Sequence, residues 1–344
     1  MQIIWRGFLY NQTEAILSQY EIEINEVTKG RGAFICNTSK GKKLLVPFRG
    51  SKEKGKMLLE FLKELKESGF EVEQIERNKN TEAVTEDEYT QERFLLKDYV
   101  DGVEISASKL EEMKEAVRML AIYHNVSEQL SAMKETGEGL CAAMLQPSEN
   151  STENVNNWQR HYRELIKVRN YIRNRKKKNE FEQIYMKHFE HNRKTAEKSL
   201  ELLQEEFDQP ARSVLCHGDF NQHNILLSNG KYRIVHFENL QYNWAMTDLA
   251  NFIRKMLEKN DWSDSVGREL IAEYDRYRPM RVAEHRQLYG LLLFPEKFWK
   301  VTNHYMNSRK TWISERDIDK LKRVIEQEEK RLNFLDKHWK TQYN

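Results

Sequence analysis

Hydrophobic positions in the first hundred residues follow both strand-like and helix-like patterns. Residues 32–38 and 44–48 are strand-like, and the polar stretch 39–42 between them is typical of a turn. We therefore expect these segments to pair as a hairpin. Pro47 has no backbone N–H, so the second strand should lie at a sheet edge or end at this residue.

A helix and a further strand are expected after this hairpin. Five apolar side chains recur at helical spacing, namely Met57, Leu58, Phe61, Leu62 and Leu65. Gly69 is the expected stop of this helix. Residues 93–100 form the next predicted strand, and the polar residues 78–88 before it are expected to be a loop.

The pattern turns helical after Asp101 and Gly102. Ser108 and Glu111 make a candidate capping box in front of apolar positions that recur at helical spacing over residues 110–124. A strand-rich small lobe is thus expected to join a helix-rich large lobe near this point.

Two further helical regions complete the pattern. Residues 158–207 are helix-rich and stop at Pro210, and the C-terminal region is helical with breaks near Pro279 and Pro295. The basic run 173–178 is interpreted as a solvated helix end or loop, with a docking patch for an acidic partner as the alternative.

Composition limits the classes of partner and compartment. Apolar residues make up 39% of the chain and charged residues 32%, which is ordinary for a globular protein. Lys and Arg total 56 against 54 for Asp and Glu, so a net charge of +2 gives no reason to expect nucleic acid as a partner. The three widely spaced cysteines, Cys36, Cys141 and Cys216, fit a reducing compartment. We expect a cytoplasmic protein without membrane insertion.

One segment carries the candidate chemistry. It reads HGDFNQHN over residues 217–224, continues into a predicted strand over 232–238 and reaches TDLA at 247–250. In phosphoryl transfer a carboxylate orients the attacking hydroxyl, and side-chain oxygens hold Mg²⁺. Asp219 and Asn224 have the residue types and the spacing for these two tasks, and the following hairpin is placed to supply a second carboxylate.

This segment resembles the HGD-x-x-x-x-N loop and the following D-F-E motif of aminoglycoside and choline phosphotransferases. More narrowly, the chain is similar to CotS-type bacterial spore-coat kinase-like proteins, since residues 291–300 (LLLFPEKFWK) resemble a C-terminal block of that family. The likeness runs from Glu23 to Trp312. It implies an α+β, two-lobed protein-kinase-like fold, with a small antiparallel-sheet lobe and one main helix in residues 1–100 and a large helical lobe in residues 101–344.

The resemblance implies roles for three residues around the loop. Asp219 matches the catalytic base, and Asn224 matches a metal ligand. Asp248 matches the aspartate of the D-L-A motif, which braces the catalytic loop. His217 is interpreted as a structural residue that hydrogen-bonds backbone near the loop.

The resemblance also implies a nucleotide site. Asp98, Tyr99 and Val100 match the hinge against which the adenine of ATP would pack, and Mg²⁺ or Mn²⁺ would accompany the nucleotide. Val46 stands where the resemblance places the family's lysine that grips the α- and β-phosphates; Lys42 or Lys43 could be recruited instead, but their position and strand parity do not fit. No complete glycine-rich loop is present either, since Gly30-Arg31-Gly32 is all that remains of it.

The metal-binding aspartate of the D-F-E motif is His236 in this chain. A neutral imidazole is a poor ligand for Mg²⁺, which prefers oxygen. We favour His236 as a neutral residue filling the vacated place; a Zn²⁺ or Mn²⁺ ligand and a residual nucleotide contact are the alternatives. Glu238, two residues on, could supply a replacement carboxylate for weak metal binding.

These departures favour a degenerate phosphotransferase site. The leading hypothesis is a pseudokinase that works in sporulation, made in the mother-cell cytoplasm and assembled with spore-coat proteins. One alternative is an active ATP-dependent small-molecule or protein kinase that uses Asp219 as the base. Another keeps the nucleotide as a structural or regulatory ligand, without transfer.

Overall fold

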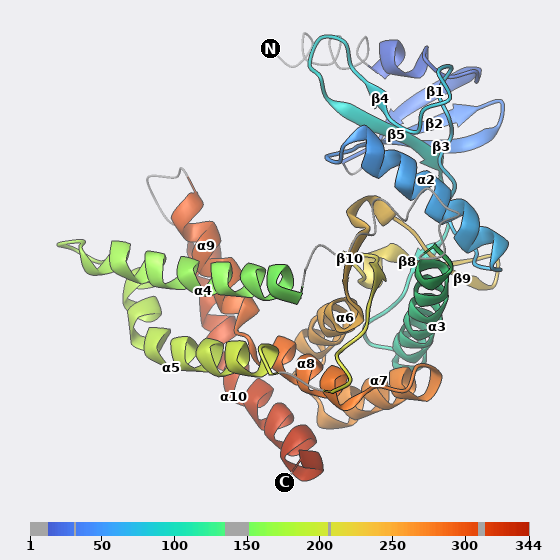
Figure 1. Cartoon of the computed structure of the whole chain (residues 1–344). Helices are drawn as coiled ribbons and strands as arrows, with labels where there is room; N and C mark the ends of the chain where they lie inside the picture. Colours follow the sequence, from blue (N-terminus) through green and yellow to red (C-terminus); the bar gives the residue numbers. More distant parts are fainter. Residues whose placement is uncertain (1–12, 31, 135–150, 206–207, 309–313, 344) are drawn as a thin grey trace. The chain divides into compact units, whose positions relative to one another are not determined.

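The computed structural model describes residues 13–30, 32–134, 151–205, 208–308 and 314–343 (Figure 1). Cys141 lies outside these ranges. The chain divides into two compact units. The first comprises the described parts of residues 1–105, 129–145 and 217–241, and the second those of 106–128, 146–216 and 242–344. The boundary between the lobes near residue 100 stays a prediction, because the chain passes from one unit to the other at several points.

A five-stranded antiparallel sheet forms the centre of the first unit. Its strands, in spatial order, are β1 (Ile24–Lys29), β2 (Phe34–Thr38), β3 (Gly41–Pro47), β5 (Arg93–Asp98) and β4 (Thr85–Glu86). The predicted hairpin is confirmed as β2 and β3, joined at Gly41, whose positive φ of 90° suits glycine. Of the two placements expected for Pro47, the second is confirmed, because β3 ends at Pro47 while lying inside the sheet. The predicted loop over 78–88 contains the short strand β4.

The predicted helix after this hairpin is α2 (Lys52–Glu67). It begins where the Ser51 side chain accepts a hydrogen bond from the Lys54 N–H, and it ends before Gly69, which has a φ of 91°. Its buried face consists of Gly55, Leu58, Leu59, Phe61, Leu62 and Leu65. The helix therefore buries the predicted apolar stripe except Met57, which is half-buried.

A second, three-stranded antiparallel sheet belongs to the same unit. It consists of β6 (Val103–Glu104), β8 (Ile225–Ser228) and β9 (Lys231–Ile234). The strand predicted over residues 232–238 is wrong beyond Ile234. His236 adopts a left-handed conformation with a φ of 69°, and Phe237–Asn239 forms a 3-10 turn.

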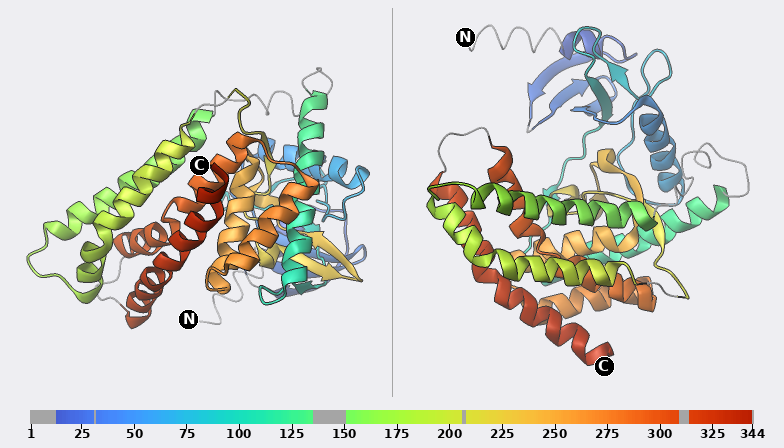
Figure 2. Two further views of the ribbon diagram at one scale, coloured as in Figure 1. Left: turned by 90° about the horizontal axis from the view of Figure 1, so that it is seen from below. Right: turned by 60° about the vertical axis from the view of Figure 1, so that its left-hand side comes forward.

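The second unit is mainly helical. Its helices are α3 (Leu110–Lys134), of which the part up to Glu128 belongs to this unit, α4 (Ser151–Arg173), α5 (Glu180–Leu203), α6 (Ala245–Lys259), α7 (Asp264–Tyr277), α8 (Val282–Leu293), α9 (Glu296–Asn307) and α10 (Glu315–Tyr343). In Figure 2, α4 and α5 lie side by side, and α9 and α10 pack against them. Side chains from these four helices, among them Leu165, Tyr185, Phe298 and Leu321, form one hydrophobic core cluster.

The helix breaks fall where prolines were expected to place them, while one predicted cap is wrong. Pro279 lies between α7 and α8, and Pro295 lies between α8 and α9. At the start of α3, Glu112 rather than Glu111 reaches back, and its carboxylate accepts the backbone N–H of Ser106 at 2.7 Å.

Two short strands, β7 (Ser213–Cys216) and β10 (Gln241–Trp244), pair in a two-stranded sheet. Cys216 is buried, as expected, and its Sγ lies 3.3 Å from the Trp244 carbonyl oxygen. None of the helices in the described ranges combines the length and apolar character that a membrane span requires.

Candidate functional site

The HGD segment is held in place by its own ring and backbone contacts. His217 is fully buried, its Nε2 lies 2.9 Å from the Val235 carbonyl oxygen, and its Nδ1 accepts the Asp219 N–H at 3.2 Å. Because Nδ1 accepts, Nε2 carries the proton and donates to Val235. Gly218 has a φ of 80°, and a Cβ there would lie 2.2 Å from the Asn239 carbonyl oxygen. This position therefore requires glycine.

The structure brings Asp219 and Asn224 together. The Asn224 Nδ2 donates to the Asp219 carbonyl oxygen at 2.9 Å and lies 3.4 Å from its carboxylate Oδ2. The Asn224 carbonyl oxygen accepts the Val235 N–H at 3.0 Å, which fixes the loop to the end of the β8–β9 hairpin. With Nδ2 engaged, Oδ1 is the Asn224 atom that could face a metal ion.

His236 and Glu238 lie around a buried lysine that the sequence analysis did not single out. The Lys97 ammonium is 2.8 Å from a carboxylate oxygen of Glu73 and 3.1 Å from Nδ1 of His236, and it forms an ion pair with Glu238. The side chain of Lys97 is 1% exposed and that of Glu73 3%. Lysine can only donate, so the His236 Nδ1 is an acceptor here. We refer to these four residues as the Lys97 cluster.

The charges of the Lys97 cluster stabilise one another. Burial opposes the ionisation of Glu238, but the charge of Lys97 and the hydrogen bond from its ammonium outweigh burial and hold the pKa of this carboxyl well below its usual range. Burial also disfavours the charged form of Lys97, yet the charges of Glu73 and Glu238 raise its pKa above the ordinary value. Both groups are therefore ionised around neutral pH.

Glu73 explains the unusual backbone at His236. One carboxylate oxygen of Glu73 accepts the backbone N–H groups of His236 at 2.8 Å and Phe237 at 3.3 Å. These bonds draw the chain out of the β9 direction and turn the His236 side chain to Lys97. The local sequence pattern could not predict this contact, because Glu73 is 163 residues away from His236.

The sheet register shows where Lys97 lies relative to Val46. Val46 pairs with Leu95 and Leu44 with Lys97, so Val46, Leu44, Leu95 and Lys97 point to the same sheet face. Val46 is buried, and its place as the substitute for the family's phosphate-binding lysine stays a prediction. A lysine is nevertheless present on this face, one strand away, in β5.

Two of the predicted hinge residues, Asp98 and Tyr99, form hydrogen bonds within the first unit. The Asp98 carboxylate lies 2.8 Å from the Lys43 ammonium and accepts the Gln74 N–H at 3.0 Å. The backbone N–H of Asp98 donates to the Gln74 carbonyl at 2.9 Å. The N–H of Tyr99 donates to the Lys42 carbonyl at 3.1 Å, and the Lys42 ammonium lies over the Tyr99 ring.

These hinge bonds bear on adenine binding. The edge of adenine presents both donor and acceptor groups, and its acceptors require an available N–H. Two of the three predicted hinge residues, Asp98 and Tyr99, use their backbone N–H groups within the chain. The third, Val100, has a partly buried side chain. An adenine acceptor would therefore have to displace one of these bonds or use Val100.

Asp248 lies in the helical unit, near the N-terminal end of α6. Its carboxylate is 3.5 Å from Nε2 of His124, whose Nδ1 is 2.7 Å from the Tyr274 hydroxyl. Burial, partly offset by Asp248, lowers the pKa of His124. Both residues are buried, so this pair links α6 to α3 and α7 inside the helical unit.

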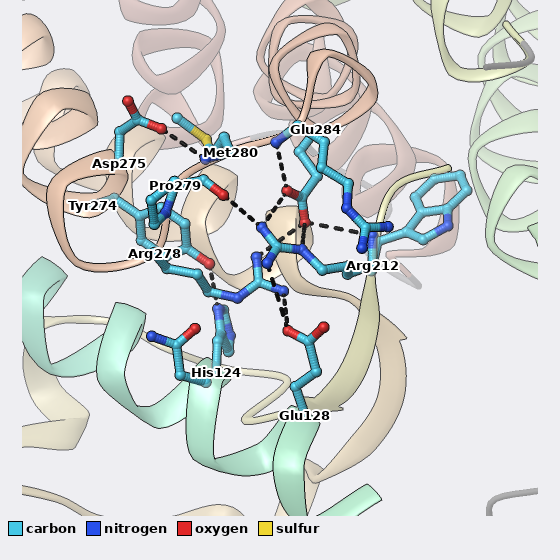
Figure 3. Close-up of polar contacts among 12 residues, drawn as sticks. His124, Glu128, Arg212, Tyr274, Asp275, Arg278, Pro279, Met280 and Glu284 are labelled. Carbon is cyan, nitrogen blue, oxygen red and sulfur yellow. Dashed lines mark hydrogen bonds and ion pairs between the residues drawn. The ribbon is translucent and has the colours of Figure 1, made fainter. Parts of the chain in front are cut away.

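A buried ion cluster adjoins His124 and Tyr274 (Figure 3). Arg212, directly before β7, donates two side-chain hydrogen bonds to Glu284, and Arg278 donates a third at 2.9 Å. Burial opposes ionisation of Glu284, but its bonds to Arg212 and the charge of Arg278 lower its pKa to about 2. Arg278 also contacts Glu128 on α3 at 2.9 Å. The cluster thus fastens the start of β7 to α3 and α8.

The helical unit contains a separate cavity of about 540 Å³. Residues of α4, α5 and α8 line it, together with Trp244 of β10. None of the residues predicted for the phosphotransferase site lines this cavity.

Sequence reasoning missed two residues of the candidate site, Lys97 and Glu73. A usable signal was present, because Lys97 follows three apolar residues inside a predicted strand and a buried lysine requires a carboxylate partner. The identity of that partner could not be read from the pattern, since Glu73 and Glu238 are 24 and 141 residues away.

Comparison with known proteins identifies the family of this chain. Residues 13–338 match the family model described as "Spore coat putative kinase YutH". Spore coat protein S of Bacillus subtilis (strain 168) is 23% identical over 338 residues, covering 94% of this chain and 92% of that protein.

Solved structures with the same fold are phosphotransferases. The aminoglycoside phosphotransferase from Alicyclobacillus acidocaldarius subsp. acidocaldarius DSM 446 matches with a TM-score of 0.73 and 17% identity, covering 94% of each chain. A spectinomycin phosphotransferase matches with a TM-score of 0.62 and 15% identity, covering 93% of this chain and 96% of that one. The α+β protein-kinase-like fold is therefore confirmed, and the chain belongs to the spore-coat kinase-like family whose model spans residues 13–338.

Proposed function

We propose that this chain is a spore-coat-associated protein that has kept the phosphotransferase fold without phosphoryl transfer, and that it acts by assembling with spore-coat proteins. The observation that carries the proposal is His236. It stands where the resemblance places a metal-binding aspartate, and its Nδ1 faces the Lys97 ammonium at 3.1 Å. A cation in that place repels Mg²⁺, and the imidazole is a poor Mg²⁺ ligand.

Two further features support the absence of transfer. Val46 is buried at the position that the resemblance gives to the phosphate-binding lysine, and the Lys43 ammonium of β3 is held by Glu76 and Asp98. Asp98 and Tyr99 use their backbone N–H groups internally, which weakens the expected adenine contact. The metal ion, the phosphates and the adenine would each lose some of their contacts with the protein. Catalysis of phosphoryl transfer depends almost wholly on such positioning and charge.

The spore-coat role rests on family membership. The related spore coat protein S carries the coat association in its name. We propose synthesis in the mother-cell cytoplasm followed by incorporation into the coat, with coat proteins as partners. The exposed basic residues at the end of α4 and just after it, including Arg173 and Lys176, are a candidate surface for an acidic partner.

An active ATP-dependent kinase is the second candidate function, because Asp219 and Asn224 lie together as base and metal ligand would. In this alternative Asp219 is the base, and Asn224 and Glu238 hold Mg²⁺ or Mn²⁺. A spectinomycin phosphotransferase of the same fold has been described in complex with ADP and its substrate.

Calorimetric titration with ATP separates the two functions. The purified chain is titrated without metal, with Mg²⁺ and with Mn²⁺. The proposal predicts no metal-dependent heat and no shift in melting temperature. Metal-dependent micromolar binding would contradict the loss of the metal and nucleotide sites, and it would favour either the active kinase or a nucleotide kept as a ligand without transfer.

A further inference from the structure

A histidine, a cysteine and an aspartate meet inside the helical unit. His124 comes from α3, Cys216 from β7 and Asp248 from α6, and none of them is more than 3% exposed. Their ligand atoms, an imidazole nitrogen, the thiol sulfur and a carboxylate oxygen, lie within 4.8 Å of one another. Elsewhere in the described ranges no three His, Cys, Asp or Glu side chains come as close together. Three elements of the unit therefore bring metal-binding atoms to one place.

These ligand types and their spacing suit zinc. Zn²⁺ binds cysteine sulfur, imidazole nitrogen and carboxylate oxygen, whereas Mg²⁺ and Ca²⁺ prefer oxygen alone. Zinc–ligand bonds of about 2.0–2.3 Å set the ligand atoms of a tetrahedral site about 3.3–3.8 Å apart. The His124 Nε2 and a carboxylate oxygen of Asp248 already have this spacing, at 3.5 Å. The other pairs have to approach by no more than about 1.5 Å.

The charges of such a site balance. A thiolate and a carboxylate carry two negative charges and a neutral imidazole carries none, so Zn²⁺ brings the sum to zero. Burying charged groups is costly unless they are paired or bind a metal. A zinc ion held by Cys216, Asp248 and neutral His124 is therefore compatible with the complete burial of the three side chains.

His124 has the hydrogen bonding of a metal ligand. Its Nδ1 lies 2.7 Å from the Tyr274 hydroxyl oxygen (Figure 3), while its buried Nε2 makes no hydrogen bond with any described residue. A metal-bound histidine almost always donates from one ring nitrogen to an outer partner and binds the metal through the other. Tyr274 is placed as that outer partner, and the Nε2 near Asp248 is left for the ion.

We propose that His124, Cys216 and Asp248 bind one Zn²⁺ ion, which ties α3, β7 and α6 together within the helical unit. Three protein ligands leave a fourth position on zinc. The Trp244 carbonyl oxygen, 3.3 Å from the Cys216 Sγ, is the candidate for it. The inference goes beyond the proposed function, because this site takes no part in nucleotide binding or phosphoryl transfer.

The alternative is a metal-free core. In it the Cys216 thiol donates to the Trp244 carbonyl oxygen, and His124 only braces Asp248. This arrangement leaves the His124 Nε2 buried without a hydrogen bond, and an unsatisfied buried polar atom costs free energy. A zinc ion would satisfy that atom, which favours the metal site.

The test measures bound metal in the whole chain, purified without a metal-affinity tag. Elemental analysis should find about one zinc per chain in the wild type and at least about a fivefold loss in Cys216→Ala. Protein produced in Co²⁺-supplemented medium should show the near-ultraviolet absorption of a Co²⁺–thiolate bond, and Cys216→Ala should lack it. Cys36→Ala is the matched control, because it empties an equally buried cysteine site in β2, outside the cluster.

A wild type that contains no zinc and shows no thiolate absorption with Co²⁺ would overturn the proposal, whatever the variants do. Equal zinc content in the wild type and Cys216→Ala, or an equal loss in Cys36→Ala, would overturn it too. Should Cys216→Ala not fold, Cys216→Ser takes its place, since a hydroxyl keeps the size of the side chain without supplying a thiolate. Zinc retained in Cys216→Ser then contradicts the proposal, and its loss supports it.

These outcomes are separable from those for the proposed function. ATP titration tests the phosphotransferase site with Mg²⁺ and Mn²⁺, whereas the zinc site is tested without nucleotide. A chain that binds zinc and also transfers phosphate would contradict the proposed function alone. A chain that does neither would contradict this inference alone.

Discussion

Lys97 and Lys43 both form ion pairs in the same sheet, but the carboxylates that they pair with differ in exposure to water. Each is paired with two carboxylates, Lys97 with Glu73 and Glu238, and Lys43 with Glu76 and Asp98. The partners of Lys43 keep 20% and 40% of their side-chain surface exposed, whereas Glu73 is 3% exposed. Water can therefore solvate the carboxylates that Lys43 would leave behind, but not Glu73.

This difference predicts the stability of two variants. Lys97→Met should lower the free energy of unfolding by about 3–5 kcal/mol, because it strands buried carboxylate charge. Lys43→Met should cost about 1 kcal/mol, because Glu76 and Asp98 remain accessible to water after the ammonium is removed. Denaturant unfolding in metal-free buffer at neutral pH measures both. A smaller loss for Lys97→Met than for Lys43→Met would show that the buried cluster does not hold the fold as described.

At the scale of elements, local patterns predicted the fold better than the site. The hairpin of β2 and β3, helix α2 and the breaks at Pro279 and Pro295 follow from periodicity and from proline and glycine chemistry. The course of the chain at His236 could not be predicted, because the Glu73 carboxylate redirects it from another part of the sequence. The pairing of Asp219 with Asn224 was suggested by their spacing, whereas the Lys97 cluster depends on tertiary contacts alone.

The HGD turn gives a prediction at this scale. Gly218→Ala places a Cβ 2.2 Å from the Asn239 carbonyl oxygen and adds the strain of a left-handed alanine. Gly230→Ala, in the β8–β9 turn, carries only that strain, because nothing lies within 4 Å of its Cβ. We expect about 1–2 kcal/mol of destabilisation for Gly230→Ala and about 1–3 kcal/mol more for Gly218→Ala. Chemical denaturation of the two variants decides; equal losses would mean that the contact with Asn239 is not tight.

At the scale of the whole chain, buried histidines make stability depend on pH. Burial lowers the pKa of His161 to about 4, and burial also lowers the pKa of His124, His285 and His338. Because the unfolded chain then binds protons more readily than the folded chain, their contribution is complete above about pH 6.5 and is lost as the pH falls towards 4.

The free energy of unfolding should accordingly decrease from pH 6.5 to pH 4. His161→Phe should make this decrease shallower, since phenylalanine can keep the stacking on Trp299 without binding a proton. The exposed His304→Phe is the matched control. Urea unfolding at several pH values gives the slopes, and an unchanged slope in His161→Phe would rule out this role for His161.

The central claim is that the fold is retained while phosphoryl transfer is lost. The most direct measurement is ATP turnover by the purified wild type with Mg²⁺ and with Mn²⁺, beside Asp219→Asn as the matched variant. We predict that both proteins release phosphate at the same background rate. Turnover by the wild type that Asp219→Asn abolishes while remaining folded would contradict the claim, and the chain would then be an active kinase with Asp219 as its base.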